Sequence, residues 1–399
     1  MKSISTTLFT LYMLFCVSCP TVDASSRTER NSRDADSVVI FAVNTKDDEG
    51  YFTDAEGNIL FDRKFQLARQ FSEGLACVCE NDKYGFINTK GKVVIPCIYD
   101  YAQDFSGGFA IVGQDRGYGI VNVRGEEIVP CIYDLIEDFT DGLAVVMYNG
   151  KTGYVNTSGE QVVPCIYDYA WGFSEGLARV YDDGKWSFID VNCNLVFTAP
   201  YDDVHDFADG LARVCRFGDV DYGFNYGYID ARGNEVIPCI YPYALDFSDG
   251  LASVGHIDRI GCINKSGEVV VSCEYQDMSW RFSEGLAYVG QNDKYGFINR
   301  KGKLVVPCVY DDVSLFSEGL AVVKQKGKYG YINTRGESVI SCEYMGAKSF
   351  KDGFAMVSDK CDWDDEVDTD VPCQIIDKTG KVVIPECTNY TTWSYVKLD

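Results

Sequence analysis

The sequence has few basic residues, and it has no long hydrophobic run after its first residues. Its 36 Lys and Arg stand against 60 Asp and Glu, which leaves a formal net charge of −24. Such a charge repels a phosphate backbone, and no concentrated basic stripe offsets it, so nucleic acid is not expected as a partner. No later run approaches the roughly 20 apolar residues that a transmembrane helix requires, so no membrane span is expected.

Histidine is also scarce, and the common catalytic motifs are missing. His205 and His256 are the only histidines, and they belong to different parts of the sequence. No GxSxG, P-loop or HExxH pattern occurs. Acidic residues recur in eight of the nine copies of a Phe-Ser-Glu-Gly segment. A catalytic carboxylate pair is needed only once, so these acids are expected to form turns and a solvated face. We therefore expect no catalytic residues and no cofactor.

The first 24 residues are typical of an export signal. Lys2 precedes a short apolar run from Leu8 to Val17, which is too short to span a bilayer. Cleavage after Ala24 would release a secreted chain, whereas the Val-Ser-Cys before Pro20 is similar to a bacterial lipobox and makes Cys19 a candidate for lipidation. Residues 25–37 are polar and charged and are expected to form a tether. The expected location is the cell envelope, with a lipid anchor, or the medium.

The remainder, residues 38–399, is a tandem repeat with a period close to 34 residues. Two markers fix the register, a phenylalanine that begins each Phe-Ser-Glu-Gly segment and a glycine in a Thr-Lys-Gly-Lys turn, which together indicate about ten units. The phenylalanines are Phe71, Phe105, Phe139, Phe173, Phe207, Phe247, Phe282, Phe316 and Phe350. The glycines are Gly57, Gly91, Gly125, Gly159, Gly233, Gly267, Gly302, Gly336 and Gly380, with Cys193 at the tenth such position.

Each unit contains three short runs rich in Val, Ile, Tyr and Phe, separated by turn residues, as in "LACVCE", "KYGFIN" and "KVVIPC". These runs predict a three-stranded antiparallel meander. Gly91 supplies the positive φ of its second hairpin, so Cys193 predicts a distorted or lengthened turn. Pro96 lacks a backbone donor and is expected to end the third strand. Gly85 is expected to be covered by an aromatic ring from a neighbouring strand or unit.

A single meander of this size cannot bury both of its faces, so each unit is expected to pack on the next. The linker after the third run carries Tyr99 and Phe105 and their equivalents. Burial of each such Phe is worth about 1.5–3 kcal/mol. We expect stacking of these rings on neighbouring units to supply much of the cohesion of the array.

The unit resembles that of the WG-repeat family of bacterial proteins, in which Phe-x-Glu-Gly-Leu-Ala-x-Val is followed by Trp-Gly, then by Ile-Asn-x-x-Gly and Ile-Pro-Pro-x-Tyr-Asp. The resemblance extends from Val38 to about Pro385, although Tyr84 and its equivalents mostly replace the family's Trp and Cys mostly replaces its second Pro. It implies an all-β repeat scaffold, often exported or envelope-associated, without a general catalytic activity or active-site residues.

The fold class is therefore all-β, with about ten tandem repeats. A propeller blade normally takes four strands and about 40 residues, and rings rarely exceed eight blades. An open, curved superhelical array is accordingly expected, with divergent first and last units as caps over the unpaired edges. A closed propeller-like ring is the alternative.

Cysteine is abundant, and seven of the 17 cysteines share one repeat position. They are Cys97, Cys131, Cys165, Cys239, Cys273, Cys308 and Cys342. Equivalent positions in successive meanders lie on the order of 14 Å apart, beyond the roughly 7 Å Cα separation that a disulfide allows, so these residues are expected to be small buried hydrophobes.

Two irregularities break the repeat. The acidic insertion 361–373 carries the candidate disulfide Cys361–Cys373 and weak candidate calcium ligands, although it lacks the EF-hand pattern. These ligands are Asp362, Asp364, Asp365, Glu366, Asp368 and Asp370. The other break is the 40-residue spacing around residues 215–230. Breaks in a repeat are where grafted function tends to lie.

The sequence thus predicts an exported, non-enzymatic scaffold that presents a surface to an unknown protein or cell-envelope partner. A glycan-binding or glycan-processing protein is an alternative, because 27 Tyr and 23 Phe provide rings that can stack on sugars. A purely structural spacer is a third possibility.

Overall fold

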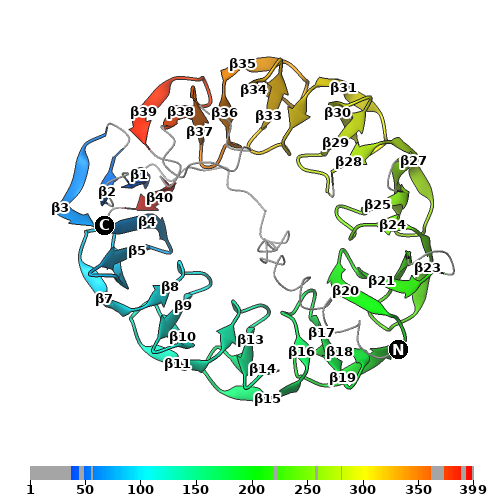
Figure 1. Cartoon of the computed structure of the whole chain (residues 1–399), viewed down its shortest axis with the longest axis horizontal. Helices are drawn as coiled ribbons and strands as arrows, with labels where there is room; N and C mark the ends of the chain where they lie inside the picture. The colour runs from blue at the N-terminus through cyan, green and yellow to red at the C-terminus, as the bar shows by residue number, and fades with distance from the viewer. Residues whose placement is uncertain are drawn as a thin grey trace, which may run out of the picture. The chain divides into compact units, whose positions relative to one another are not determined.

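The computed structural model describes residues 37–44, 49–54, 57–218, 223–256, 259–279, 281–360, 373–387 and 392–397. These residues form 40 β-strands in ten four-stranded antiparallel sheets, which are arranged in a ring (Figure 1). They contain no helix, and therefore none that could cross a membrane. The export signal, most of the tether and the acidic insertion are outside these ranges.

Each sheet is a blade with one strand from each of four positions, and blades 1 to 10 are numbered in chain order (Figure 1). The inner strands of blades 1 to 10 are β40 (Thr392–Lys397), β4 (Leu67–Ser72), β8 (Tyr101–Ala102), β12 (Leu135–Ile136), β16 (Tyr169–Ala170), β20 (Asp203–Ala208), β24 (Tyr243–Ala244), β28 (Asp277–Met278), β32 (Asp312–Val313) and β36 (Gly346–Ala347). The second strands are β1 (Ser37–Asn44), β5 (Leu75–Glu80), β9 (Phe109–Gln114), β13 (Leu143–Tyr148), β17 (Leu177–Asp182), β21 (Leu211–Phe217), β25 (Leu251–His256), β29 (Leu286–Gln291), β33 (Leu320–Gln325) and β37 (Phe354–Ser358). The third strands are β2 (Gly50–Thr53), β6 (Lys83–Asn88), β10 (Gly117–Asn122), β14 (Lys151–Asn156), β18 (Lys185–Asp190), β22 (Phe224–Ile229), β26 (Arg259–Asn264), β30 (Lys294–Asn299), β34 (Lys328–Asn333) and β38 (Cys373–Asp377). The outer strands are β3 (Ile59–Phe65), β7 (Val93–Tyr99), β11 (Glu127–Tyr133), β15 (Gln161–Tyr167), β19 (Leu195–Ala199), β23 (Glu235–Tyr241), β27 (Val269–Tyr275), β31 (Leu304–Tyr310), β35 (Ser338–Tyr344) and β39 (Val382–Cys387).

The inner strand is the element that the three-stranded prediction missed. It comes from the linker and usually has only two residues, as in β8, where Tyr101 pairs with Gly113 and Ala102 with Val112. A run of this length carries no periodic signal. Four strands fit into about 34 residues because the turn at Glu73-Gly74 has two residues, both with positive φ, as a type I′ hairpin requires.

The ends of the described chain meet in one sheet, and this pairing closes the ring. The order of blade 1 is β3-β2-β1-β40, so the last strand of the chain hydrogen-bonds to the first. The closed ring kept as the alternative is therefore the correct architecture, and the open array is not. The divergent first and last units do not cap separate edges, because they complete a common blade.

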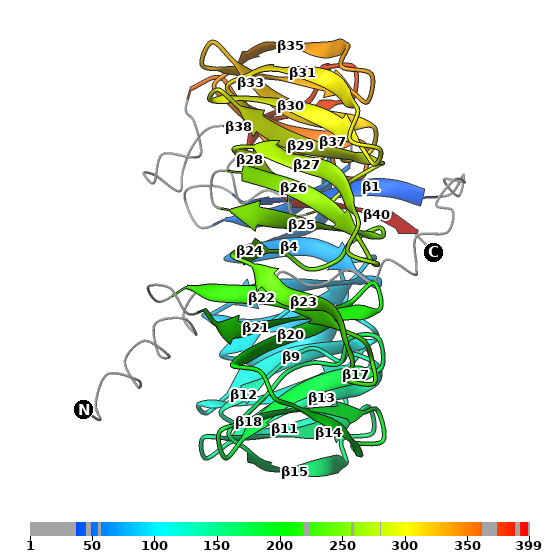
Figure 2. The same cartoon turned by 90° about the vertical axis from the view of Figure 1, so that its right-hand side faces the viewer.

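The alternation of antiparallel strands places the turns on the two faces of the ring, which Figure 2 shows edge-on. We call one face the hairpin face; it carries the turns between second and third strands, such as Asn81-Asp82, and the junctions from outer to inner strands, such as Asp100. The opposite glycine face carries the turns at Glu73-Gly74 and at Gly91.

Two predictions about single residues in each unit are wrong. Pro96 does not end the third meander strand but lies inside β7, at a bulge between the pairs Tyr84–Tyr99 and Phe86–Ile95. Gly85 is not covered by an aromatic ring. A Cβ on Gly85 would meet backbone atoms of this bulge at 2.6 Å, so the glycine is required because the neighbouring backbone passes directly over it.

The turn at Cys193 is neither distorted nor lengthened. Cys193 has a φ of +63° and donates its N–H to the carbonyl of Asp190 at 2.7 Å. Gly91 makes the same bond to Asn88 at 2.9 Å with a φ of +73°. The backbone of Cys193 therefore adopts the left-handed conformation despite its Cβ, and the turn keeps its length.

The predicted stacking between units is confirmed at all but one of the junctions between blades in the described residues. A ring from one blade contacts a ring from the next at nine of the ten junctions, and the exception in the described residues is blade 7 to blade 8, where Cys262 occupies the strand position. The centroid distances are 5.2 Å for Phe52–Phe71, 4.8 Å for Phe86–Phe105, 4.8 Å for Phe109–Phe139, 5.3 Å for Tyr154–Phe173, 5.1 Å for Phe188–Phe207, 4.7 Å for Tyr228–Phe247, 4.8 Å for Phe297–Phe316, 4.8 Å for Tyr331–Phe350 and 5.5 Å for Phe41–Phe354.

The recurrent acids of the glycine face have a second role beside turn formation. The carboxylate of Glu73 in blade 2 accepts the N–H of Gly108 in blade 3 at 2.7 Å, and the Ser72 hydroxyl donates to the Phe105 carbonyl at 2.6 Å. Equivalent acid-to-glycine bonds link blades 4 to 5, 5 to 6, 6 to 7, 8 to 9 and 9 to 10. The Phe-Ser-Glu-Gly segment therefore supplies a stacking ring, a tight turn and a bond to the next blade.

Candidate functional site

One column of buried positions changes character in the sector of blades 5 to 7. The third residue of the second strand faces the next blade and is mostly apolar: Cys77, Ile111, Val145, Ser253, Tyr288, Val322 and Met356. In β17 and β21 this position holds Arg179 and Arg213. A guanidinium in a packed interface is costly unless its hydrogen bonds are satisfied, so these replacements require partners.

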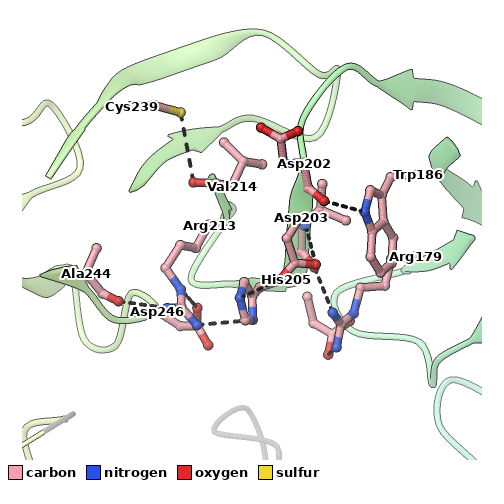
Figure 3. Close-up of polar contacts among 12 residues, drawn as sticks. Arg179, Trp186, Asp202, Asp203, His205, Arg213, Val214, Cys239, Ala244 and Asp246 are labelled. Carbon is pink, nitrogen blue, oxygen red and sulfur yellow. Dashed lines mark hydrogen bonds and ion pairs between the residues drawn. The ribbon is translucent and has the colours of Figure 1, made fainter. Parts of the chain in front are cut away.

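Both arginines find their partners on the inner part of the next blade (Figure 3). Arg179 donates from Nε to Oδ1 of Asp206 at 2.8 Å and from Nη1 to the Val204 carbonyl at 2.7 Å. Arg213 repeats the arrangement one blade later, with Asp246 at 2.9 Å and the Ala244 carbonyl at 2.7 Å. Each arginine side chain is only 13% exposed, whereas each carboxylate is roughly half-exposed.

Blade 2 reaches an equivalent arrangement from another strand. Arg69 lies on the inner strand β4, donates to the Ala102 carbonyl at 3.0 Å and lies 3.9 Å from Oδ1 of Asp104. Asp104, Asp206 and Asp246 all precede the repeat phenylalanine. The pairing of arginine with this carboxylate is thus a variation that the repeat tolerates, and blades 5 to 7 hold two consecutive examples.

His205 lies between the two arginine pairs, on β20 (Figure 3). Its Nδ1 is 3.1 Å from Nη2 of Arg213, and its Nε2 is 3.6 Å from Oδ2 of Asp203. Because a guanidinium can only donate, Nδ1 accepts and the ring proton is on Nε2. Burial, Arg213 and Arg179 together hold the pKa of His205 well below its usual value, so the ring is neutral near pH 7.

The pKa values of two carboxyl groups around His205 are shifted in the opposite direction, upward. Burial raises the pKa of Asp203 and of Asp206, and Arg179 offsets part of the shift in both. Burial also raises the pKa of Cys215, the strand partner of Asp203, to about 12, so that thiol is protonated. The polar groups are held in place by one another, which suits a rigid binding surface.

Aromatic side chains border this network on blade 5. Tyr169 lies in the inner strand β16, Trp171 directly follows it, and Tyr181 is the penultimate residue of β17; all three are half-buried. The guanidinium of Arg179 lies 4.3 Å from the Trp171 ring centroid, a cation–π distance. Trp171 also lies 5.2 Å from Trp186, whose Nε1 donates to the Asp202 carbonyl at 3.2 Å. Trp171 occupies the position of Gln103 in blade 3, so this surface too is particular to the sector.

The 40-residue irregularity belongs to the same sector, because it lies in the β21–β22 hairpin of blade 6. Its two closing residues are Phe217 and Phe224, which are 66% and 38% exposed. Their rings stack with centroids 4.8 Å apart. Of the two breaks in the repeat, this one thus lies in the same blade as Arg213 of the arginine network.

The other predicted site residues do not enter this sector. Cys19, Cys361 and the six acidic candidates for calcium, Asp362 to Asp370, are outside the described residues, whereas Cys373 lies in β38. The structure therefore leaves the disulfide, lipidation and calcium predictions as predictions. His256, at the end of β25, is exposed. Across the described ranges, no three His, Cys, Asp or Glu residues are grouped to hold a metal ion.

The seven equivalent cysteines remain separate thiols, as expected. Each sulfur points to the carbonyl of a valine in the second strand of its own blade, at 3.6–4.0 Å, as with Cys97 and Val78. Six are half-buried and Cys273 is exposed, so the prediction that this position is buried is wrong. Burial raises the pKa of Cys97 and of its equivalents, so these thiols are protonated near neutral pH.

Comparison with known proteins places this architecture in a family. The model of the WG containing repeat matches nine segments: 52–84, 84–116, 118–151, 153–186, 186–216, 226–255, 260–295, 295–329 and 329–360. The chain belongs to the WG-repeat family. A search of curated proteins finds no significant match.

Solved structures with similar folds have low sequence identity to this WG-repeat chain. A eukaryotic initiation factor matches with 11% identity over 90% of this chain and 96% of its own, at a TM-score of 0.53. Porphyromonas gingivalis dipeptidyl peptidase 4 has 9% identity, coverages of 81% and 59% and a TM-score of 0.45. Apo AztD from Citrobacter koseri has 12% identity, coverages of 90% and 98% and a TM-score of 0.37. At 11% identity and a TM-score of 0.53, the likeness to the initiation factor concerns the fold alone.

Proposed function

We propose that this WG-repeat ring is an exported, non-enzymatic scaffold that binds a protein partner through the sector of blades 5 to 7. The observation that carries the proposal is the concentration of departures from the repeat in this sector. At two repeat positions this sector holds residues that the other blades do not have there, namely Arg179 and Arg213 at one and Trp171 at the other. Features needed to close the ring recur at nearly every junction, whereas a binding site is needed once.

The chemistry of the sector suits recognition of a polypeptide. Half-buried aromatic rings provide an apolar surface, and arginine and aromatic residues are enriched in protein interfaces. The carboxylates of Asp206 and Asp246 are fixed by arginines but remain roughly half-exposed, so they can still accept hydrogen bonds. The net charge of −24 favours a basic partner and a fast, salt-sensitive association.

The proposal of a non-enzymatic role is supported by the hydrogen bonding and protonation of the polar groups in the network. The Nδ1 of His205 is engaged by Arg213, and the nearby Cys215 is protonated and buried. A general base with its lone pair engaged and a thiol with a raised pKa are poor catalysts. These groups act better as fixed hydrogen-bonding elements.

A glycan-binding protein is the second candidate, and one observation favours it. Tyr169 and Trp171 lie 6.2 Å apart at the inner strand of blade 5 and are half-buried, and the guanidinium beside Trp171 holds the Asp206 carboxylate. Flat rings beside hydrogen-bond acceptors also suit sugar rings. A structural spacer is less well supported, because a spacer requires no special sector.

The two candidates are separated by selecting ligands for the intact protein. A library of random 15-residue peptides and a glycan array are screened in parallel with the full chain and with Trp171→Gln, which introduces the residue found at position 103. Tyr101→Ser in blade 3, a 38% exposed aromatic, is the matched control. We expect enriched basic peptides whose binding falls with Trp171→Gln and not with Tyr101→Ser. Glycan hits with the same dependence, without peptide enrichment, would favour the second candidate.

The proposed export has its own test. Fractionation of cells that express the full chain is expected to place it in the envelope or the medium. A Cys19→Ser variant that loses incorporated fatty acid would identify the anchor, whereas release of a chain beginning at Ser25 would identify cleavage after Ala24. Retention of the complete chain in the cytoplasm contradicts export.

A further inference from the structure

The end of the β21–β22 hairpin differs from the equivalent hairpins of the other blades. The two residues that close this hairpin are polar or small in most blades, for example Glu80 with Lys83 and Gln291 with Lys294. In blade 6 they are Phe217 and Phe224. Neither ring belongs to a hydrophobic core cluster, and both are exposed, so the packing of the blade does not account for them.

We infer that Phe217 and Phe224 form a docking point for a large apolar side chain of the protein partner, flanked in that partner by lysine or arginine. This inference rests on the proposed function and assigns a contact to it. The two rings are stacked at 30° with centroids 4.8 Å apart, so they present a continuous apolar surface on the hairpin face.

Hydrogen bonds of the surrounding backbone fix the positions of the two rings. The N–H of Phe217 donates to Oδ2 of Asp202 at 2.8 Å, and the N–H of Gly218 donates to the Gly223 carbonyl at 2.7 Å, which extends the hairpin beyond the pair. Next to it, the Arg216 guanidinium lies 4.4 Å from the Tyr201 ring centroid. A preorganised aromatic surface binds with a smaller entropy loss than a flexible one.

Acidic residues on the same face as the two rings select the kind of partner. Asp182 and Asp183 at the blade 5 hairpin and Asp202 at the junction into blade 6 are exposed on the same face. These carboxylates attract a basic segment and disfavour an acidic one. A second copy of this chain would bring the same acidic face and a net charge of −24, so self-association is disfavoured. The occupant is therefore a basic polypeptide with an exposed apolar side chain.

The test uses three labelled peptides that differ in one property each: Gly-Ser-Lys-Lys-Trp-Lys-Lys-Ser-Gly, the same peptide with Ser for Trp, and the same peptide with Glu for each Lys. Binding to the full chain is followed by fluorescence anisotropy at low and physiological salt. We expect the Lys-Trp peptide to bind at least about tenfold more tightly than either of the others, with an affinity that falls as salt is added.

The double variant Phe217→Ser/Phe224→Ser is expected to reduce this affinity by about tenfold or more. Tyr148→Ser is the matched control, because Tyr148 closes the blade 4 hairpin and is 47% exposed, and it is expected to leave the affinity unchanged. Since the substituted rings are exposed, the double variant should keep the wild-type denaturation midpoint, which verifies its fold.

Several results would overturn the inference. Equal binding by the double variant, or equal binding of the Ser peptide, would mean that the rings do not act as an anchor. Equal binding of the Glu peptide would contradict the basic chemistry. A wild-type dimer in sedimentation that the double variant abolishes would make a second copy the occupant. If library peptides depend on Trp171 and not on the phenylalanines, the proposed function stands and this inference fails.

Discussion

The junctions between blades 8, 9 and 10 and those between blades 5, 6 and 7 use the same ring stacking and the same acid-to-glycine bonds but differ in one column. Blade 9 presents Val322 to blade 10, where Ser349 precedes the repeat phenylalanine. Blade 5 presents Arg179 to blade 6, where Asp206 holds the position of Ser349. The ring therefore closes without an ion pair at this column, and the charged network is an addition to a complete structural unit.

The largest expected effect tests the part that both sectors share. Phe316→Ala, between blades 8 and 9, and Phe207→Ala, between blades 5 and 6, each remove a 2% exposed ring from a stack. Each is expected to lower the free energy of unfolding by about 3–5 kcal/mol, because the cavity adds to the lost burial. Chemical denaturation measures both. If Phe207→Ala cost much less than Phe316→Ala, the ion pairs would be replacing the stack in blades 5 to 7, and the comparison would fail.

The stacking could be foreseen because it rests on a residue that recurs in register, and the same holds for the turn glycines. The inner strand could not, since Tyr101 and Ala102 are too few to show a period. Ring closure depends on β40 pairing with β1, which is a contact between opposite ends of the sequence with no local signal. The predictions for Pro96 and Gly85 are wrong because each considers one strand alone. The bulge arises from the pairing of two strands, β6 with Gly85 and β7 with Pro96.

The arginine network is visible in the sequence once the units are superimposed. Arg179 and Arg213 interrupt a column of mostly apolar residues, and this interruption was the available signal for the site. Their partners could not be assigned in advance, because Arg69 reaches the same kind of carboxylate from a different strand. A guanidinium on a long side chain can satisfy one interface from more than one position.

The second prediction replaces the charged pair between blades 5 and 6 with the residues found at the equivalent positions between blades 9 and 10. Arg179→Val leaves Asp206 without its guanidinium and is expected to cost about 1–3 kcal/mol, as for a partly buried polar group that loses its partner. The double variant Arg179→Val/Asp206→Ser recreates the pairing of Val322 with Ser349 and is expected to recover most of this loss. Denaturation of the two single variants and the double variant completes the cycle. A double variant as unstable as the sum of both singles would show that the two residues do not act as a pair.

The third prediction concerns pH and only the irregular sector, since His205 has no equivalent elsewhere in the ring. Its pKa is lower in the folded protein than the roughly 6.5 of an unfolded chain, so below this value the unfolded state binds more protons. Stability should therefore fall as pH drops through about 6.5, by at most about 1.4 kcal/mol per pH unit for one proton. The measurement is the difference in unfolding free energy between wild type and His205→Gln from pH 7.5 to 5.

Using that difference removes the contribution of nearby carboxyl groups. The raised pKa values of Asp203 and Asp206 have the opposite sign, because a folded carboxyl that binds protons more readily favours the folded state as the pH falls. Both variants retain these groups. A pH-independent difference would mean that His205 titrates normally and is not held neutral by Arg213.

The smallest effect concerns the turn between the third and outer strands of blade 5, where Cys193 takes the place of the repeat glycine. Cys193 has a φ of +63°, and a Cβ in this region costs about 1 kcal/mol, whereas a glycine there costs a few tenths to 1 kcal/mol through the entropy of the unfolded chain. Its side chain also packs on the core between blades 4 and 5, which offsets part of the strain. Cys193→Gly is therefore expected to change the free energy of unfolding by less than about 1 kcal/mol, because these contributions nearly cancel.

The reverse exchange in blade 4, Gly159→Cys, tests whether conformational strain alone determines the stability of this turn. At Gly159 a Cβ would lie 2.0 Å from the carbonyl oxygen of Ile128, so Gly159→Cys is expected to cost about 1–3 kcal/mol through the forced shift of the backbone, in addition to the strain of a φ of +80°. Thermal denaturation of both variants compares them. Equal and opposite shifts would mean that conformational strain alone governs the turn. The expected inequality would instead show that Cys193 survives because its own neighbours leave room for a side chain.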